Sequence, residues 1–184
     1  LTIGDATTQK SKVSKSVVDG RAVHVKAWPL TYLPSDKGVG TPPKTHDILG
    51  WKDYARNASD QWVRGHLLSE NLHGPGVKWN LTPINQKANS DMEGQEKLMK
   101  PKIKSNKTES KNNQGNYFYY ITNVTYGRPE QDDDEHIHHI PQLVTIEQGT
   151  LKKVGNNFEY LKKGSPVPIP VSYTHLRAHE TRGN

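Results

Sequence analysis

One short stretch of the chain combines a base, a cationic side chain and an amide oxygen. Val63-Arg64-Gly65-His66 is followed by Asn89 within a run of helix-forming residues. An imidazole, with an unperturbed pKa of ~6.5, can take a proton from water. A guanidinium can donate two hydrogen bonds to a phosphate, and an amide oxygen suits Mg²⁺. Phosphodiester hydrolysis needs these three groups, so we predict His66 as base, Arg64 at the phosphate and Asn89 at the metal.

Two glutamates and two lysines extend this set. Glu93 and Glu96 follow Asn89 by four and seven residues, which places them near one helix face. A carboxylate there can hold metal-bound water, and we assign Glu96 to the metal site. An ordinary solvated helix face is the alternative for both glutamates. Lys87 and Lys97 are predicted to bind substrate phosphates.

The spacing of these residues resembles a known family. Arg64-Gly65-His66 is followed by Asn80-Leu81-Thr82-Pro83, and Asn89 comes nine residues after Asn80. This pattern resembles the DNA/RNA non-specific endonucleases of the His-Me finger (ββα-metal) superfamily, as found at the ends of bacterial toxins and injected effectors. The resemblance implies that His66 is the general base and that Asn89 binds Mg²⁺, or another divalent cation such as Mn²⁺. It also implies that Arg64 lies near the phosphate and that Asn80 supports the catalytic site.

The chain departs from this family pattern at one position. Val63 stands where the family has an aspartate that holds a water in the metal shell. Glu70 and Glu96 are the nearby acids that can replace it. The segment between His66 and Asn80 is also shorter than in the free secreted enzymes of the family.

Composition agrees with a nucleic-acid partner without requiring one. The 184 residues carry a formal net charge of +6, and a basic balance suits a polyanion such as DNA or RNA. There is no cysteine, which excludes disulfides and thiolate metal sites. No apolar run reaches the ~18 residues of a membrane span, so membrane insertion is not expected. The resemblance and a start at Leu1 suggest a domain of a larger secreted or delivered bacterial protein, with an immunity protein as a further partner.

Two other functions stay open at this point. The first is a nucleic-acid-binding module without catalysis, which Val63 favours, and the second is an interaction domain whose charge serves solubility.

The lysine-rich segment 97–111 is interpreted as a basic loop that either binds the phosphate backbone or is simply solvated. His136 and His138 share a strand face, but a polar exposed face is favoured over a metal site. The acidic run 132–135 is interpreted as a solvated loop.

The elements that must position the site follow from periodicity and turn residues. We expect strands over 21–33, 61–68, 78–82, 117–126, 136–146 and 151–160, the last two joined at Gln148-Gly149, and a helix over 85–99 that ends before Pro101. Residues 1–20 are expected to be a linker or disordered arm, 21–170 the nuclease domain, and 171–184 a non-native tail that resembles translated sequencing adapter. The predicted fold class is α+β, a central antiparallel sheet with a ββα-metal catalytic unit.

Overall fold

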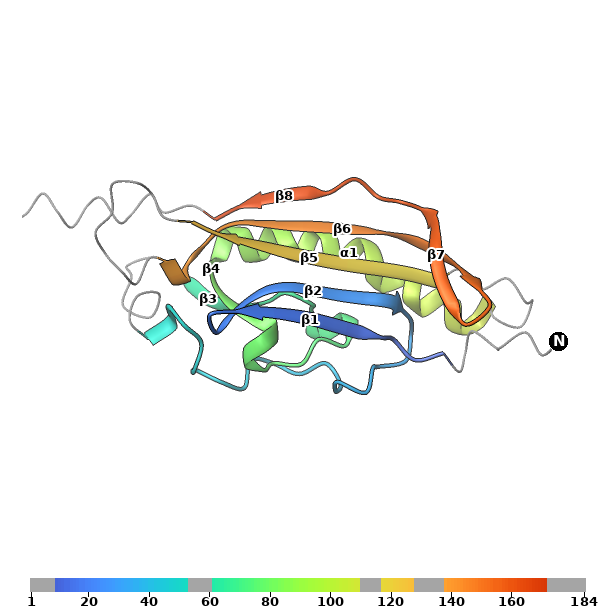
Figure 1. Cartoon of the computed structure of the whole chain (residues 1–184), viewed down its shortest axis with the longest axis horizontal. Helices are drawn as coiled ribbons and strands as arrows, with labels where there is room; N and C mark the ends of the chain where they lie inside the picture. Colours follow the sequence, from blue (N-terminus) through green and yellow to red (C-terminus); the bar gives the residue numbers. More distant parts are fainter. Residues whose placement is uncertain (1–8, 53–60, 110–116, 128–137, 172–184) are drawn as a thin grey trace, which may run out of the picture.

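The main body of the protein is one antiparallel sheet of six strands (Figure 1). The computed structural model describes residues 9–52, 61–109, 117–127 and 138–171. The strands lie in the order β1-β2-β5-β6-β7, with β8 paired to the other end of β6. Their bounds are β1 (Val13–Val18), β2 (Arg21–Leu30), β5 (Tyr117–Tyr126), β6 (Pro141–Val154), β7 (Asn157–Lys162) and β8 (Val167–Pro170).

A separate two-stranded sheet leads directly into the helix. β3 (Trp62–His66) pairs antiparallel with β4 (Leu81–Asn85), and their connection holds the short 3-10 helices η2 (Glu70–Leu72) and η3 (Lys78–Asn80). Helix α1 (Gln86–Glu109) begins at once, because the Asn85 side-chain oxygen accepts a hydrogen bond from the Ala88 amide at 2.8 Å. In Figure 1, α1 lies behind β5 and β6. The second sheet and the helix therefore cover the same face of the main sheet.

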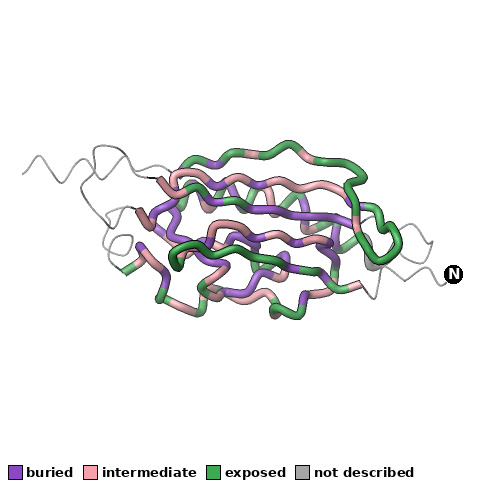
Figure 2. Tube along the Cα trace, viewed as in Figure 1, coloured by how far each residue is buried: buried purple, intermediate pink, exposed green. Residues whose placement is uncertain are grey.

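Burial follows the alternation of the strands (Figure 2). One apolar cluster contains residues from all the major strands and from α1, and Leu30, Ile84 and Ile146 are fully buried within it. A smaller cluster, built around Tyr117 and Tyr119, lies on the opposite face of the main sheet. Successive residues of a strand point to opposite faces, so β5 contributes to both clusters.

The expected fold class is wrong. The described residues contain a single α-helix against eight strands, and every strand pair within the two sheets is antiparallel. The protein is thus a mostly antiparallel β-structure with one helix, and not an α+β fold. The physical reason is that the described residues between β2 and β3 form no α-helix, and the core face of the main sheet is covered by one helix together with the small sheet of β3 and β4.

The helix is longer than expected, and the predicted basic loop over 97–111 does not form within its described part. α1 continues through Pro101 to Glu109. A proline inside a helix removes one hydrogen bond and costs ~3 kcal/mol. Met99 and Ile103, which flank Pro101, are 1% and 3% exposed. Their burial offsets that cost, so tertiary packing overrides the local breaker.

Two further boundaries differ from the sequence prediction. Residues 13–18 of the expected linker form β1, which pairs with β2. β6 runs straight through Gln148-Gly149, and the hairpin turn lies instead at Gly155. A side chain at Gly149 would collide with the Tyr119 ring opposite, so this glycine permits close packing and makes no turn. The acidic run 132–135, His136 and residues 172–184 lie outside the described residues.

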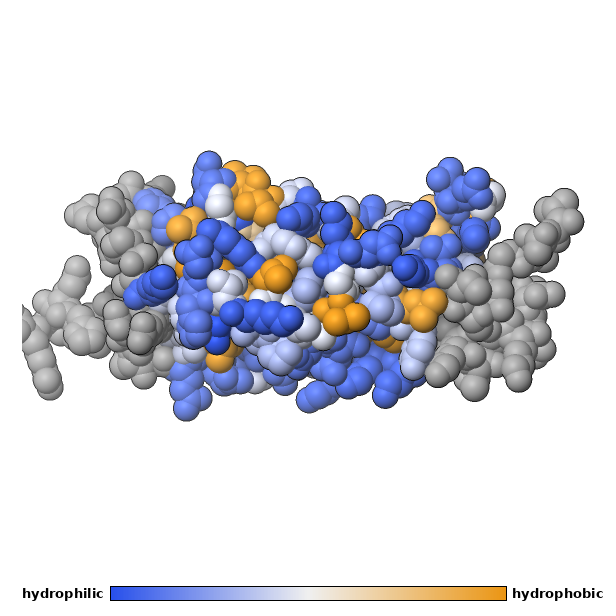
Figure 3. Space-filling view, turned by 90° about the horizontal axis from the view of Figure 1, so that it is seen from below, coloured by the Kyte–Doolittle hydropathy of each residue, from blue (hydrophilic) through white to orange (hydrophobic). Residues whose placement is uncertain are grey.

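The surface shown in Figure 3 is mainly hydrophilic, with isolated hydrophobic residues. Single exposed apolar side chains are normal on a protein surface. Among the described residues, no helix is long and apolar enough to cross a membrane.

Candidate active site

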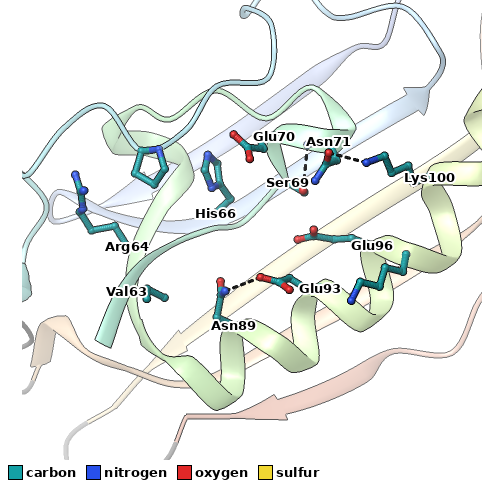
Figure 4. A pocket seen from close by; sticks show the side chains of 12 residues that line it. Val63, Arg64, His66, Ser69, Glu70, Asn71, Asn89, Glu93, Glu96 and Lys100 are labelled. Carbon is teal, nitrogen blue, oxygen red and sulfur yellow. Dashed lines mark hydrogen bonds between the residues drawn. The ribbon is translucent and has the colours of Figure 1, made fainter. Parts of the chain in front are cut away.

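A pocket of about 340 Å³ lies between β3, the loop that follows it, and α1 (Figure 4). Five of the seven predicted site residues line this pocket, namely Arg64, His66, Asn89, Glu96 and Lys97. They come from two elements that pack against each other. The pocket also contains Pro43, Val63, Ser69, Glu70, Asn71, Glu93 and Lys100.

His66 is held at the end of β3 by a backbone acceptor. Its Nε2 lies 2.8 Å from the carbonyl oxygen of Thr41. A carbonyl can only accept, so Nε2 carries the proton and Nδ1 keeps the lone pair. Burial lowers the pKa of His66 below 6.5, against the opposing effects of the Thr41 hydrogen bond and the Glu70 charge. The ring is therefore neutral near pH 7 and able to accept a proton at Nδ1.

Asn89 presents its amide oxygen next to β3. Its Nδ2 donates to the Glu93 carboxylate at 2.9 Å, one helical turn further on. That bond fixes the amide orientation and leaves Oδ1 free of it (Figure 4). A Cβ placed on Gly65 would lie 3.5 Å from this Oδ1 and would collide with Ile84. Because Gly65 has no side chain, β3 can lie close to both β4 and the helix.

The carboxylates of the pocket are crowded. The pKa of Glu96 is raised to about 7, chiefly by burial; the charges of Glu93 and Glu70 contribute to this rise, whereas a hydrogen bond from Ser69 and the charge of Lys100 oppose it. Three carboxyl groups, those of Glu70, Glu93 and Glu96, share this cavity with three cationic side chains, but no ion pair joins the two sets among the described residues, and the neighbouring carboxylates still help to raise the pKa of Glu96. A bound cation would relieve this repulsion.

Arg64 lies at one side of the pocket with part of its guanidinium already engaged. Nη1 donates to the Thr45 carbonyl at 2.8 Å, and the group lies over the Trp51 ring at 5.5 Å. A guanidinium has five N–H donors in a fixed plane. One bond and one aromatic contact orient that plane and leave donors for a phosphate.

Two predicted site residues lie elsewhere. Asn80 is fully buried, and its side chain bonds the Leu68 amide at 2.8 Å, the Leu68 carbonyl at 2.8 Å and the Pro75 carbonyl at 3.0 Å. It therefore closes the loop after His66 and does not line the pocket. Lys87 is exposed and pairs with Asp91 at 2.6 Å, away from the pocket residues.

The oxygen atoms that line the pocket are of the kind that binds a hard divalent cation. The pocket offers the Asn89 oxygen and the carboxylates of Glu93 and Glu96 from one helix, with Glu70 across the cavity. Oxygen donors in small number suit Mg²⁺, which keeps several waters. Across the described part of the chain, however, no three His, Cys, Asp or Glu side chains are grouped as a metal site. The residues thus fit a hard cation that keeps several of its water ligands. They do not fit a site in which protein side chains supply all the ligands.

Several functional candidates could not be identified from the sequence. The Thr41 carbonyl is a main-chain atom, and no residue pattern marks it. Ser69 caps η2 through a 3.1 Å bond to the Asn71 amide and also reaches Glu96. Lys100 follows Glu96 by four residues, a spacing that would have revealed it had the helix been extended through Pro101.

The comparisons with known proteins give no family. No protein-family model matches the chain, and no curated protein matches it significantly. The geometry of the pocket is therefore the observation from which a function must be inferred.

Proposed function

We propose that the protein is a metal-dependent endonuclease that hydrolyses phosphodiester bonds of DNA, RNA or both, with little sequence preference. The observation that carries this proposal is the bond from His66 Nε2 to the Thr41 carbonyl. It leaves Nδ1 as acceptor in a pocket that also holds a hard-cation donor set and an arginine. The spacing of residues 64–66, 80–83 and 89, which resembles non-specific endonucleases, supports the same function.

The protein groups divide the reaction between them. Nδ1 of His66 takes a proton from water as the water oxygen attacks phosphorus, and the ester bond to the leaving oxygen breaks. The leaving oxygen takes a proton from solvent, and His66 returns its own proton to solvent. Arg64 donates to the non-bridging oxygens, where negative charge builds up.

Asn89 and Glu96 would hold the cation, with Glu93 orienting Asn89 through its 2.9 Å bond. When bound, the cation neutralises charge on the phosphate and on the leaving oxygen. The contacts proposed for Arg64 and for the cation are all made to the phosphate, and phosphate contacts carry no sequence information. Low sequence preference follows.

A nuclease assay on plasmid DNA and on structured RNA, with Mg²⁺ and with excess EDTA, tests the proposal. His66→Ala should lower the cleavage rate by ~10²–10⁴-fold, the range lost with a general base. His73→Asn is the matched control, because His73 is also partly buried and bonded to a carbonyl, that of Thr31 at 3.0 Å, but lies outside the pocket. Asparagine tolerates the positive φ of 71° at that position.

The control should cleave at the wild-type rate, and circular dichroism should show both variants folded. Full activity of His66→Ala, or wild-type activity undiminished by EDTA, would contradict the proposal.

A nucleic-acid-binding module without catalysis is the second candidate. Val63 lines the pocket where the family pattern has an acid, and the described residues contain no three-ligand metal group. This candidate predicts salt-dependent binding with no cleavage at any metal concentration. The same assay separates the two.

A further inference from the structure

Helix α1 carries two of the pocket's three acidic residues, Glu93 and Glu96, and a row of lysines along one face. Glu96 is followed four residues later by Lys100, and Lys100 four residues later by Lys104. Lys97 stands four residues after Glu93. At 3.6 residues per turn, these residues and Asn89 form one stripe. The acidic groups occupy its first part and the lysines its second.

The burial of α1 confirms the orientation of the stripe. Met92, Met99 and Ile103 are 1%, 1% and 3% exposed and face the core. Lys97 and Lys100 line the pocket, and Lys104 is exposed one turn beyond it. The lysine row therefore starts inside the pocket and continues out of it along the surface.

Lys100 is fixed at the point where the row leaves the pocket. Its Nζ donates to Asn71 Oδ1 at 2.8 Å, which spans the gap between α1 and the loop after β3 (Figure 4). An ammonium has three donors, so this bond leaves others for an anion. Apart from Arg64, the remaining pocket wall is rich in carboxylates, so on the α1 side of the pocket an anion is favoured along the lysines.

The length of the row indicates the size of its ligand. Asn89 and Lys104 are fifteen residues apart, which corresponds to ~22 Å at ~1.5 Å per residue. Nucleic acid carries a charge every ~3.4 Å per strand along a duplex. The lysine row itself, from Lys97 to Lys104, covers seven residues or ~10 Å of this length, which matches about three consecutive phosphates. A mononucleotide or dinucleotide bound at Asn89 would not reach Lys104.

We propose that α1 is the track for the substrate strand on one side of the cleaved bond, with its phosphates bound by Lys97, Lys100 and Lys104. The inference rests on the proposed function and makes it more specific. The substrate is a polymer, and cleavage at a distance from strand ends is favoured over trimming of terminal nucleotides. Lysines bind phosphate as point charges without reading bases.

Binding of a fluorescent single strand, measured by anisotropy in EDTA over a range of salt concentrations, tests the track without any cleavage. Lys104→Gln should lower the slope of log affinity against log salt by ~0.7, the value for one phosphate contact on a single strand. Lys97→Gln should do the same. Lys102→Gln is the matched control, because it removes the same charge from the same helix but lies two residues, about 200°, around from Lys104.

The control slope should equal that of the wild type, and a dinucleotide should bind all four proteins equally weakly. Equal slopes for Lys104→Gln and Lys102→Gln would overturn the track, because only net charge would then matter. Wild-type protein without affinity for the strand at low salt would overturn it as well. If the strand binds along α1 but the wild type never cleaves it, the track stands and the endonuclease proposal fails.

Discussion

The bond between His66 and Thr41 determines which imidazole nitrogen can act as base. Because Nε2 is committed to a carbonyl 2.8 Å away, a tautomer with its proton on Nδ1 would lose this bond and place two acceptors together. Arrangements in which one ring nitrogen donates to a carbonyl are common ways to fix the other nitrogen as the reactive one. This geometry thus leaves Nδ1 as the ring nitrogen of His66 that can accept a proton.

The pH dependence of cleavage should reflect this environment. Burial lowers the pKa of His66, so the ring stays neutral, and competent as base, to a pH below 6.5. As the pH is lowered, kcat/KM should therefore decline with a midpoint below pH 6.5. Glu70→Gln removes a carboxylate that raises this pKa, so it should move the midpoint to still lower pH. Rates measured from pH 5 to 8 check both shifts. Saturating Mg²⁺ is needed, because a bound cation keeps the Glu96 carboxyl, whose pKa is about 7 without metal, ionised. Under that condition a midpoint above 6.5 would show that His66 is not the titrating base.

Gly65 is the residue whose size matters most to the pocket. A Cβ there would collide with Ile84 and touch Asn89 Oδ1 at 3.5 Å. Ile84 is fully buried and has no room to move. Gly65→Ala should therefore destabilise the protein by ~1–3 kcal/mol, the usual cost of overpacking a core. Urea denaturation measures this loss, and an unchanged midpoint would mean that β3 and β4 can separate without cost.

At this scale the sequence predicted which residues meet in one pocket better than it predicted what each side chain contacts. His66, Asn89 and Arg64 could be named because their types and spacing suit phosphodiester hydrolysis, and the structure brings them into one pocket. Asn80 shares the same motif, yet its side chain is consumed by three bonds to the backbone. A sequence cannot distinguish an amide that faces a ligand from one that faces its own main chain.

At the scale of elements, α1 combines poor local helix propensity with strong packing. Gly94 and Pro101 both weaken a helix, and the expected end before Pro101 followed from that rule. The helix persists because Met92, Met99 and Ile103 repeat at helical spacing against the core. Propensity is local and readable from sequence, whereas the sheet that buries these residues is assembled from distant segments.

Replacement of Gly94 should strengthen α1. A Cβ at Gly94 meets nothing within 4 Å, so Gly94→Ala should raise the free energy of unfolding by ~0.5–1 kcal/mol. Gly155→Ala is the control, because a Cβ there also meets nothing but the residue has a φ of +60°. It should destabilise by ~1 kcal/mol, the cost of a left-handed alanine. Thermal melts of both variants check the pair, and a stabilised Gly155→Ala would refute the conformational argument.

At the scale of the whole molecule, one apolar cluster joins the main sheet, the second sheet and the helix. The pocket is built on the second sheet and α1, and both rest on β2, β5 and β6 through this cluster. In the main sheet β2 and β5 were predictable from alternating apolar residues, whereas β1 falls in the expected linker, β6 runs through the expected turn, and no strand was expected at β8. The fold class was not predictable, because it depends on how many strands and helices the whole chain forms and not on any single segment.

Such a shared core predicts cooperative unfolding. Urea transitions followed by tryptophan fluorescence and by far-ultraviolet circular dichroism should coincide. Trp62 lies in the large cluster, whereas Trp28 packs against the smaller one on the opposite face, so fluorescence samples both sides of the sheet. Two separated transitions would instead show that β3, β4 and α1 unfold as an independent unit.

The contact that orients His66 has a consequence for how mutations affect the protein. Its acceptor at Thr41 belongs to the main chain, so no substitution at that position can delete it. What keeps the carbonyl in place is the docking of the 38–44 loop, where Lys44 bonds the Gly76 carbonyl at 2.8 Å and a Cβ on Gly40 would collide with Glu70. The loop should thus tolerate substitutions that spare its glycines and the Thr41 hydroxyl, which accepts a bond from the Gly76 amide at 2.8 Å, but should not tolerate a change of length. Insertions, deletions and bulk at its glycines are the changes that would misalign the base.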